Sequence, residues 1–178
     1  MEKSAIFIDA GNIIKSWWAY CRVNELTDKI DYLKLVELLS KDTNLLRAYF
    51  YDGVPEAIPV KKKGFLQALE HKGIQLRTKI LKKRNHYCEN CKTSTTKQIQ
   101  KGVDVSLATD ILRHGFQKSC DICIIASGDE DYKDAMDLIK DRGIKVWVSA
   151  FKDSLASEVK RTADKVIILD EVFDKIKQ

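Results

Sequence analysis

Carboxylates follow two short apolar segments of the chain. Residues 122–126 are entirely apolar and lead, after Ser-Gly, into three consecutive acids at 129–131. Near the N-terminus, residues 5–8 lead in the same way into Asp9. Such runs are typical of strands that are buried on both faces of a parallel sheet. Ligands of these sheets bind at the carboxyl ends of the strands, so the pattern predicts that both strands deliver acids to one edge.

A third acidic position lies between these two segments. Asp104 falls in the first turn of a predicted helix over 103–113, where the helix dipole favours an anion, and an aspartate there is usually a cap. Asp110 is six residues further on, roughly 120° around the helix, and therefore does not share the face of Asp104. Several aspartates that are crowded together cannot all stay ionised without a cation. Their oxygens suit Mg²⁺, so a cluster at this edge predicts a metal site.

The elements that must position these acids alternate along the chain. Helical periodicity is found at residues 13–21, from 32, from 59, and at 132–141 and 154–163, with a short helix at the end. Further apolar strands are predicted at 45–51, 74–81, 144–149 and 166–169. Cation-glycine pairs, at Gly73, Gly115 and Gly143, are expected to close helices. Repeated strand-helix-strand units predict a parallel sheet with right-handed crossovers.

The composition describes a globular protein. With 178 residues, 44% hydrophobic and 32% charged, we expect one domain over residues 1–178. No apolar run is long enough to cross a membrane and no targeting segment is evident, so a cytoplasmic location is expected. The five cysteines, an odd number, favour reduced thiols over a disulfide framework. A net charge of +5 permits a nucleic-acid partner but does not require one.

Basic and aromatic groups suggest where such a partner could bind. Lys61, Lys62 and Lys63 begin a predicted helix, where cations are mildly unfavourable and so hint at an external anion. The cations of 82–84 are expected to extend the basic edge of the strand at 74–81. Adjacent tryptophans at 17 and 18 could stack on bases, but their helical spacing favours a place in the core.

One polar segment interrupts the alternation. Residues 85–100 lack apolar anchors and are expected to form an exposed loop or hairpin insertion. Cys88 and Cys91 have the spacing of half a zinc site, with His86 as a possible third ligand. A second Cys-x-x-Cys pair at 120 and 123 makes a four-cysteine site formally available, although Cys123 is expected to pack inside a buried strand.

Three motifs, in order, resemble those of the NYN domain family, a branch of the PIN-like nucleases, with the LabA-like members most similar. They are FIDAGN at 7–12, KGVDVSLATDIL at 101–112 and SGDEDY at 127–132, and residues 163–169 resemble the closing strand of the family. The resemblance covers nearly the whole chain. It implies a three-layer α/β/α sandwich with a central parallel sheet, an acidic pocket for Mg²⁺ or Mn²⁺, and cleavage of RNA.

The resemblance also assigns roles to particular residues. By motif position, Asp9, Asp104 and Asp129 are expected to hold the metal ion. Asp131 is then the fourth acid of the site, and Asn12 is a supporting polar group. The insertion at 85–100 and Glu130 depart from the family pattern without removing a motif acid. The cations expected to contact the nucleic-acid backbone are Lys61, Lys62, Lys63, Lys82, Lys83, Arg84, Lys97 and Lys101.

These expectations favour a metal-dependent nuclease, a hydrolase that acts on phosphodiester bonds, and an endoribonuclease above the other kinds. The main alternative is a non-catalytic RNA-binding or interaction module on the same fold. A haloacid-dehalogenase phosphatase would need an acid at position 11, which is glycine, and a Rossmann dinucleotide site would need G-x-G-x-x-G. The order of the motifs does not match a response-regulator receiver. The choice between RNA and DNA, endo and exo cleavage, and monomer and homodimer stays open.

Overall fold

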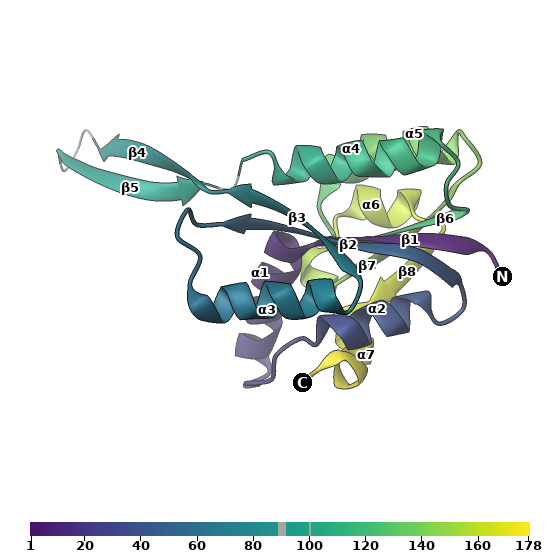
Figure 1. Cartoon of the computed structure of the whole chain (residues 1–178), viewed down its shortest axis with the longest axis horizontal. Coiled ribbons are helices and arrows are strands. Elements are labelled where there is room, and N and C mark those ends of the chain that lie inside the picture. The colour runs from purple at the N-terminus through teal and green to yellow at the C-terminus, as the bar shows by residue number, and fades with distance from the viewer. Residues whose placement is uncertain (89–91, 100) are drawn as a thin grey trace.

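A parallel sheet lies at the centre of the computed structural model, which describes residues 1–88, 92–99 and 101–178. Within these residues the sheet has six strands, in the order β3-β2-β1-β6-β7-β8 (Figure 1). The strands are β1 (Lys3–Asp9), β2 (Asn44–Val54), β3 (Ile74–Ile80), β6 (Ile122–Ala126), β7 (Lys145–Ala150) and β8 (Lys165–Ile168).

Helices cover both faces of the sheet and make three layers (Figure 1). One face carries α1 (Ala10–Val23), α2 (Tyr32–Ser40), α3 (Val60–His71) and α7 (Leu169–Ile176). The other face carries α4 (Val103–Phe116), α5 (Lys133–Lys140) and α6 (Ser157–Thr162), and two short 3-10 turns, η1 (Glu130–Tyr132) and η2 (Lys152–Ser154), follow β6 and β7. The predicted α/β sandwich with a parallel sheet is confirmed.

Strand β1 shows why the central strands are apolar throughout. Ile6 and Ile8 point into the core under α1 and α2, whereas Phe7 points into the core under α4 and α5. All three side chains are fully buried. Strand β6 is buried in the same way over its whole length. A strand between two helical layers needs apolar side chains on both faces, and this accounts for the run that the sequence shows.

The order in which the chain adds strands to the sheet changes direction between β1 and β6. Strands β2 and β3 lie on one side of β1, whereas β6, β7 and β8 lie on the other. The two central strands are paired in parallel, with Ile8 beside Ala126, so the residues after both strands emerge side by side. This is the switch point at which open α/β sheets bind their ligands.

The polar insertion is an antiparallel hairpin. Strands β4 (Lys82–Cys88) and β5 (Thr93–Ile99) pair only with each other and project beyond the carboxyl edge of the main sheet (Figure 1). The predicted hairpin insertion is therefore confirmed, but it begins at Lys82 rather than at residue 85. Cys91 lies outside the described residues. For His86, Cys88 and Lys97 the structure describes only the backbone, so zinc binding by this hairpin stays a prediction.

The second cysteine pair is separate from that hairpin. Cys120 precedes the amino end of β6, whereas the hairpin leaves the carboxyl end of β3, and these ends lie at opposite edges of a parallel sheet. The Cys120 and Cys123 sulfur atoms are 3.6 Å apart and buried, and the contact with Cys123 lowers the pKa of Cys120. The four-cysteine combination is therefore not supported.

Three further details refine the predicted elements. Gly73 and Gly143 have φ angles of 87° and 84° and end helices as predicted. Gly115 instead lies inside α4, where a Cβ would come within 2.2 Å of the Ile139 side chain, so this glycine allows α4 to approach α5. The helical spacing predicts a core position for Trp18, but this side chain is 63% exposed.

Over the described residues, no helix has the length and apolar character needed to cross a membrane.

Candidate active site

Asp9 is the buried centre of the polar groups at the switch point. It ends β1 and caps α1, and its Oδ1 accepts a hydrogen bond of 3.0 Å from the Asn12 backbone N–H. Its Oδ2 accepts hydrogen bonds from the Tyr132 hydroxyl at 2.9 Å and the Ser127 hydroxyl at 3.3 Å. The residue is only 3% exposed, so Asp9 serves both as a helix cap and as an acid that is held in one orientation.

Asp104 reaches the same tyrosine from α4. Its Oδ1 lies 3.4 Å from the Tyr132 hydroxyl oxygen, which also contacts Asp9. The N-cap of α4 is Gly102, so Asp104 lies in the first turn of the helix without being its cap. One hydroxyl therefore brings together two carboxylates that are 95 positions apart in the sequence.

The turn after β6 brings the third acid. The Asp129 backbone N–H donates to the Ser127 hydroxyl at 3.2 Å, and the Asp129 carboxylate accepts a 3.1 Å hydrogen bond from the Asp131 N–H. Asp129 is therefore the cap of η1, as well as a neighbour whose charge acts on Asp104. Asp131 is exposed and lies further out, although its charge also acts on Asp104.

Close packing fixes the position of this turn. The Asn12 side-chain oxygen accepts a 3.2 Å hydrogen bond from the Gly128 N–H and so joins the loops that follow β1 and β6. The Gly128 carbonyl accepts a 3.0 Å hydrogen bond from the Ala156 N–H. A Cβ on Gly128 would lie 2.2 Å from the Ser154 carbonyl oxygen, so only glycine fits there. Asn12 thus holds the turn after β6 against the start of α1.

Burial and mutual repulsion raise the pKa values of two acids in the cluster. Burial raises the pKa of Asp9, and the charge of Asp104 raises it further, although hydrogen bonds from Asn12 and Tyr132 oppose the shift. Burial likewise raises the pKa of Asp104, followed by the charges of Asp129 and Asp131. The same burial and carboxylates raise the pKa of the Tyr132 phenol, which therefore stays protonated and donates its hydrogen bond.

These donors fit a hydrated divalent ion. Mg²⁺ commonly binds through one or two carboxylates and completes its shell with waters and substrate phosphate. Asp9 and Asp104 supply such a pair. Within the residues that the structure describes, no three His, Cys, Asp or Glu side chains are close enough to surround a metal ion directly. The arrangement therefore suits a water-rich site better than a closed cage of protein ligands.

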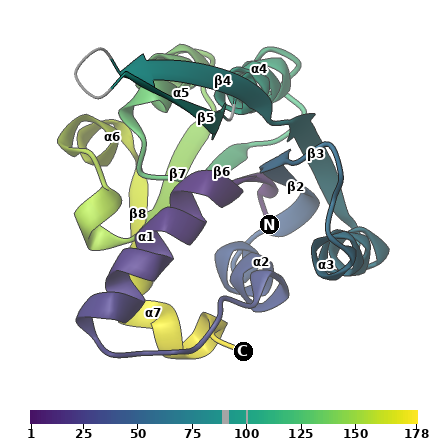
Figure 2. The ribbon, with the colours of Figure 1, turned by 90° about the vertical axis from the view of Figure 1, so that its left-hand side faces the viewer.

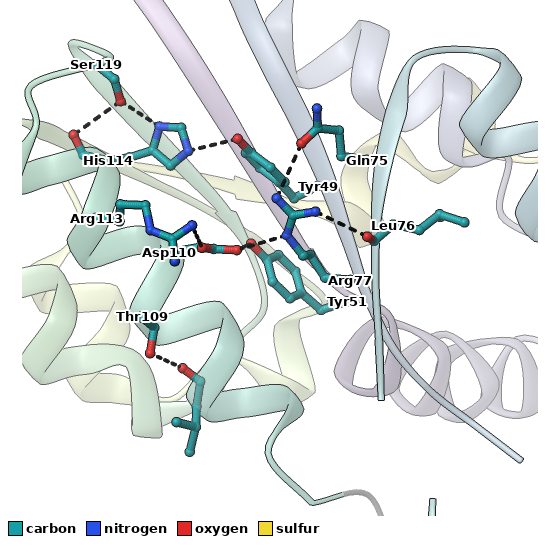
Figure 3. Close-up of polar contacts among 11 residues, drawn as sticks. Tyr49, Tyr51, Gln75, Leu76, Arg77, Thr109, Asp110, Arg113, His114 and Ser119 are labelled. Carbon is teal, nitrogen blue, oxygen red and sulfur yellow. Dashed lines mark hydrogen bonds and ion pairs between the residues drawn. The ribbon is translucent and has the colours of Figure 1, made fainter. Parts of the chain in front are cut away.

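Asp110, on the same helix as Asp104, belongs to a different group of side chains (Figure 3). It accepts hydrogen bonds from the Tyr51 hydroxyl at 2.8 Å and from Arg77 Nε at 3.3 Å, and it pairs with Arg113 at 3.0 Å. Its charge is thus balanced within the protein, and its contacts fasten α4 to β2 and β3. The helical spacing correctly separates Asp110 from the face of Asp104.

The predicted cations differ in their surroundings. Lys61 and Lys63 are exposed at the start of α3, which follows the carboxyl end of β2, whereas Lys62 pairs with Asp52 at 2.9 Å. Lys82 and Lys101 are exposed at the two ends of the hairpin connection. Lys83 and Arg84 lie in β4, where only the backbone is described.

Tyr132 is the member of the site that the sequence does not single out. It ends the SGDEDY motif, but a tyrosine at the start of a predicted helix is most simply a core residue, and its ring is indeed 1% exposed. Its hydroxyl meets Asp9 across 123 positions of sequence. The only signal in the sequence is its place directly after the acids.

Comparison with known proteins identifies the family of the chain and its fold. The family model "NYN domain" matches residues 3–170. The Low amplitude and bright protein LabA of Synechococcus elongatus is 24% identical over 178 residues, which cover 96% of this chain and 86% of that protein. A crystal structure of a protein of unknown function from Vibrio parahaemolyticus has a TM-score of 0.73 at 19% identity, covering 99% of this chain and 96% of that one. This last likeness shows a shared fold. With the family model matching almost its full length, the chain belongs to the NYN domain family.

Proposed function

We propose that this protein is a divalent-metal-dependent nuclease that hydrolyses phosphodiester bonds in RNA. NYN domains are in general nuclease-like proteins of the PIN type. The observation that carries the proposal is the shared Tyr132 hydroxyl, at 2.9 Å from Asp9 and 3.4 Å from Asp104. The charges that act on these acids are other carboxylates, and a hydrated divalent ion would relieve their repulsion.

Each residue has a distinct part in this proposal. A bound divalent ion activates water and offsets the charge that builds up on a phosphodiester under attack. Asp9 and Asp104 would hold that ion, and Asp129 would complete its surroundings. Tyr132 keeps the first two carboxylates oriented, while Asn12 fixes the turn that carries Asp129. Asp131, at the exposed rim, would bind an outer water.

The surroundings of the cluster suit a polyanionic substrate. Phosphate backbones bind mainly through lysine and arginine, and the exposed cations Lys61, Lys63, Lys82 and Lys101 flank the carboxyl edge of the sheet. Without them, four neighbouring acids would repel a phosphodiester. We therefore propose that these cations hold the backbone while the acidic cluster acts on one bond.

A cleavage assay tests the proposal. Labelled RNA and DNA oligonucleotides of the same sequence, single-stranded and duplex, are incubated with Mn²⁺, Mg²⁺ or EDTA. We expect cleavage of RNA with either ion, none with EDTA, and a loss of at least about a hundredfold for Asp104→Asn, as expected when a group that stabilises the reaction is removed. RNA with both ends blocked should still be cut if the attack is internal.

Two results would overturn the proposal. Cleavage by Asp104→Asn protein at the parent rate would show that a contaminating enzyme is responsible. Tight binding of RNA without turnover under any metal condition would instead identify the non-catalytic binding module that the fold also permits.

A further inference from the structure

One exposed stripe of α1 leads away from the acidic site. Asn12, Lys15, Trp18 and Arg22 follow one another at spacings of three, three and four residues, which places them along one side of the helix. Asn12 belongs to the acidic site, and the other three side chains are exposed. Trp18 is 63% exposed. Its ring contacts the Trp17 ring, with centroids 4.8 Å apart, and the exposed remainder of this side chain lies between two cations, where a ligand can reach it.

Three cavities line up along this stripe. The first, of about 390 Å³, is lined by Asn12, Asp129 and Lys15 among others. The second, of about 550 Å³, shares Lys15 with the first and also contacts Trp18. The third, of about 630 Å³, shares Trp18 with the second and extends to Lys61 at the start of α3. The cavities therefore form a tract that begins at the acids and passes Trp18, along the helix that Figure 2 shows in front of the sheet.

Beyond the acidic first cavity, the charge along the tract becomes positive. The second cavity is lined by Lys15, Arg22 and Lys29, and no acid is among its lining residues. Within the described part of the chain, none of these three cations takes part in a salt bridge. Unpaired cations beside an exposed indole match the combination that binds single-stranded nucleic acid, in which phosphates meet cations and bases stack on aromatic rings.

We propose that this tract, formed by Lys15, Trp18, Arg22 and Lys29, binds an unpaired segment of the nucleic acid that is cleaved at the acidic site. The inference rests on the proposed nuclease function and adds the class of substrate. Trp18 stacks on a base, which requires that base to be free of a partner strand. At 1.5 Å per residue, Trp18 lies about 13 Å along the axis from Asp9, so it binds a nucleotide beyond the one that is cut.

Charge also argues against a second copy of this chain as the occupant. An apolar ring can mediate self-association, but two copies meeting through this face would bring like charges together, which costs interaction energy. A polyanion instead meets the cations Lys15, Arg22 and Lys29 that line the second cavity.

The test measures binding in EDTA, where turnover is prevented, by fluorescence anisotropy with a labelled single-stranded RNA of about twelve nucleotides. Trp18→Ala should weaken binding by about 5-fold to 150-fold, the range that corresponds to the loss of one stacked base. Trp18→Phe keeps an aromatic face and should recover most of the affinity. The matched control is Phe116→Ala, which removes another exposed aromatic ring beside an arginine, Arg142, on the opposite helical layer. It should bind as the parent does.

Equal binding by Trp18→Ala and the parent overturns the inference, as does an equal loss on a fully paired duplex, because stacking needs an unpaired base. A change in sedimentation of Trp18→Ala without a change in RNA affinity assigns the face to self-association and also overturns it. The nuclease proposal is judged separately, by cleavage. A parent protein that cuts RNA while Trp18→Ala binds normally refutes the tract alone.

Discussion

At the scale of single residues, the site depends on one tyrosine hydroxyl that touches two aspartates. Tyr132 donates to Asp9 at 2.9 Å and lies 3.4 Å from Asp104. A hydroxyl has a single proton, so it cannot satisfy both carboxylates fully, and one of them keeps oxygen lone pairs for another partner. Because the phenol is fully buried and stays protonated, it fixes the spacing of the two acids before any ligand arrives.

Asp104→Asn should stabilise the protein in EDTA. Burial and the charges of Asp129 and Asp131 raise the pKa of Asp104. Removing its charge relieves that repulsion, and we expect a gain of less than about 1 kcal/mol because water screens a partly exposed group. The Asn12→Asp change, which adds a charge at the same edge, should destabilise. Thermal melting of both variants in EDTA measures these effects.

The stability gained by Asp104→Asn should depend on pH. A carboxyl group with a raised pKa contributes stability at low pH that is lost as the pH rises through the folded-state value. The advantage of Asp104→Asn should therefore be present at neutral pH and disappear toward pH 3.8, the ordinary value, where the parent aspartate is protonated as well. An advantage that is the same at both pH values would contradict the repulsion account.

At the scale of elements, α4 carries two acids with opposite tasks. Asp104 faces the site, whereas Asp110 ties the helix to the sheet through Tyr51, Arg77 and Arg113 (Figure 3). Arg77 also contacts the neighbouring strand β2, where its guanidinium carbon lies 5.1 Å from the centre of the Tyr49 ring. The register of α4 against β2 and β3 thus sets where Asp104 stands.

Asp110→Ala should destabilise the protein and reduce activity only indirectly. It leaves the buried Tyr51 hydroxyl without an acceptor, which costs about 1–3 kcal/mol. Activity measured well below the melting temperature should fall far less than for Asp104→Asn. The matched control is Thr109→Ala, the exposed neighbour whose hydroxyl bonds only to the Val105 carbonyl of the same helix, with an expected change within about 0.5 kcal/mol. Chemical denaturation of the parent, Asp110→Ala and Thr109→Ala measures their free energies of unfolding. A destabilisation by Asp110→Ala no larger than that by Thr109→Ala would show that the contacts of Asp110 do not hold α4 on the sheet.

At the scale of the whole molecule, much of the fold could be predicted because its signals are local. The fully apolar runs of β1 and β6 are buried on both faces, and glycines 73 and 143 end helices with positive φ angles. Non-local packing leaves no such signal. Gly115 has the same cation-glycine pattern as a helix end, yet it serves the packing of α4 against α5, and the hairpin begins at Lys82, three residues before the predicted insertion.

Some features of the candidate site likewise follow from local sequence signals, whereas others depend on tertiary packing. The parallel sheet that the sequence predicts places Asp9 and Asp129 at the same edge, but the pairing of β1 with β6 is known only from the structure. The exposure of Trp18 depends on which residues of α1 meet the sheet and α2, and the periodicity of an apolar stripe leaves that rotation uncertain by about one residue, or 100°. The contact between Tyr132 and Asp9 depends on tertiary packing alone.

The distribution of charge yields a prediction for binding to nucleic acid. Lys61→Ala combined with Lys63→Ala should weaken RNA affinity and reduce the slope of log affinity against log salt, by about 0.7 for each phosphate that is no longer neutralised. Lys62 is kept, because it pairs with Asp52 at 2.9 Å. The control removes two exposed lysines at the other edge, Lys41 and Lys72. Salt titrations of binding compare the variants, and an equal slope for both would place the backbone path elsewhere.

The central claim is that Asp9, Asp104 and Asp129 form one cation-binding cluster, and Mn²⁺ titration by calorimetry at pH 7 tests it without any nucleic acid. We predict that the parent binds Mn²⁺ and that Asp104→Asn binds it at least about tenfold more weakly, since even changes around metal ligands have effects of that size. Asp141→Asn, which removes an exposed acid at the far end of α5, should bind as the parent does. Equal Mn²⁺ affinity of the parent and Asp104→Asn would contradict the claim.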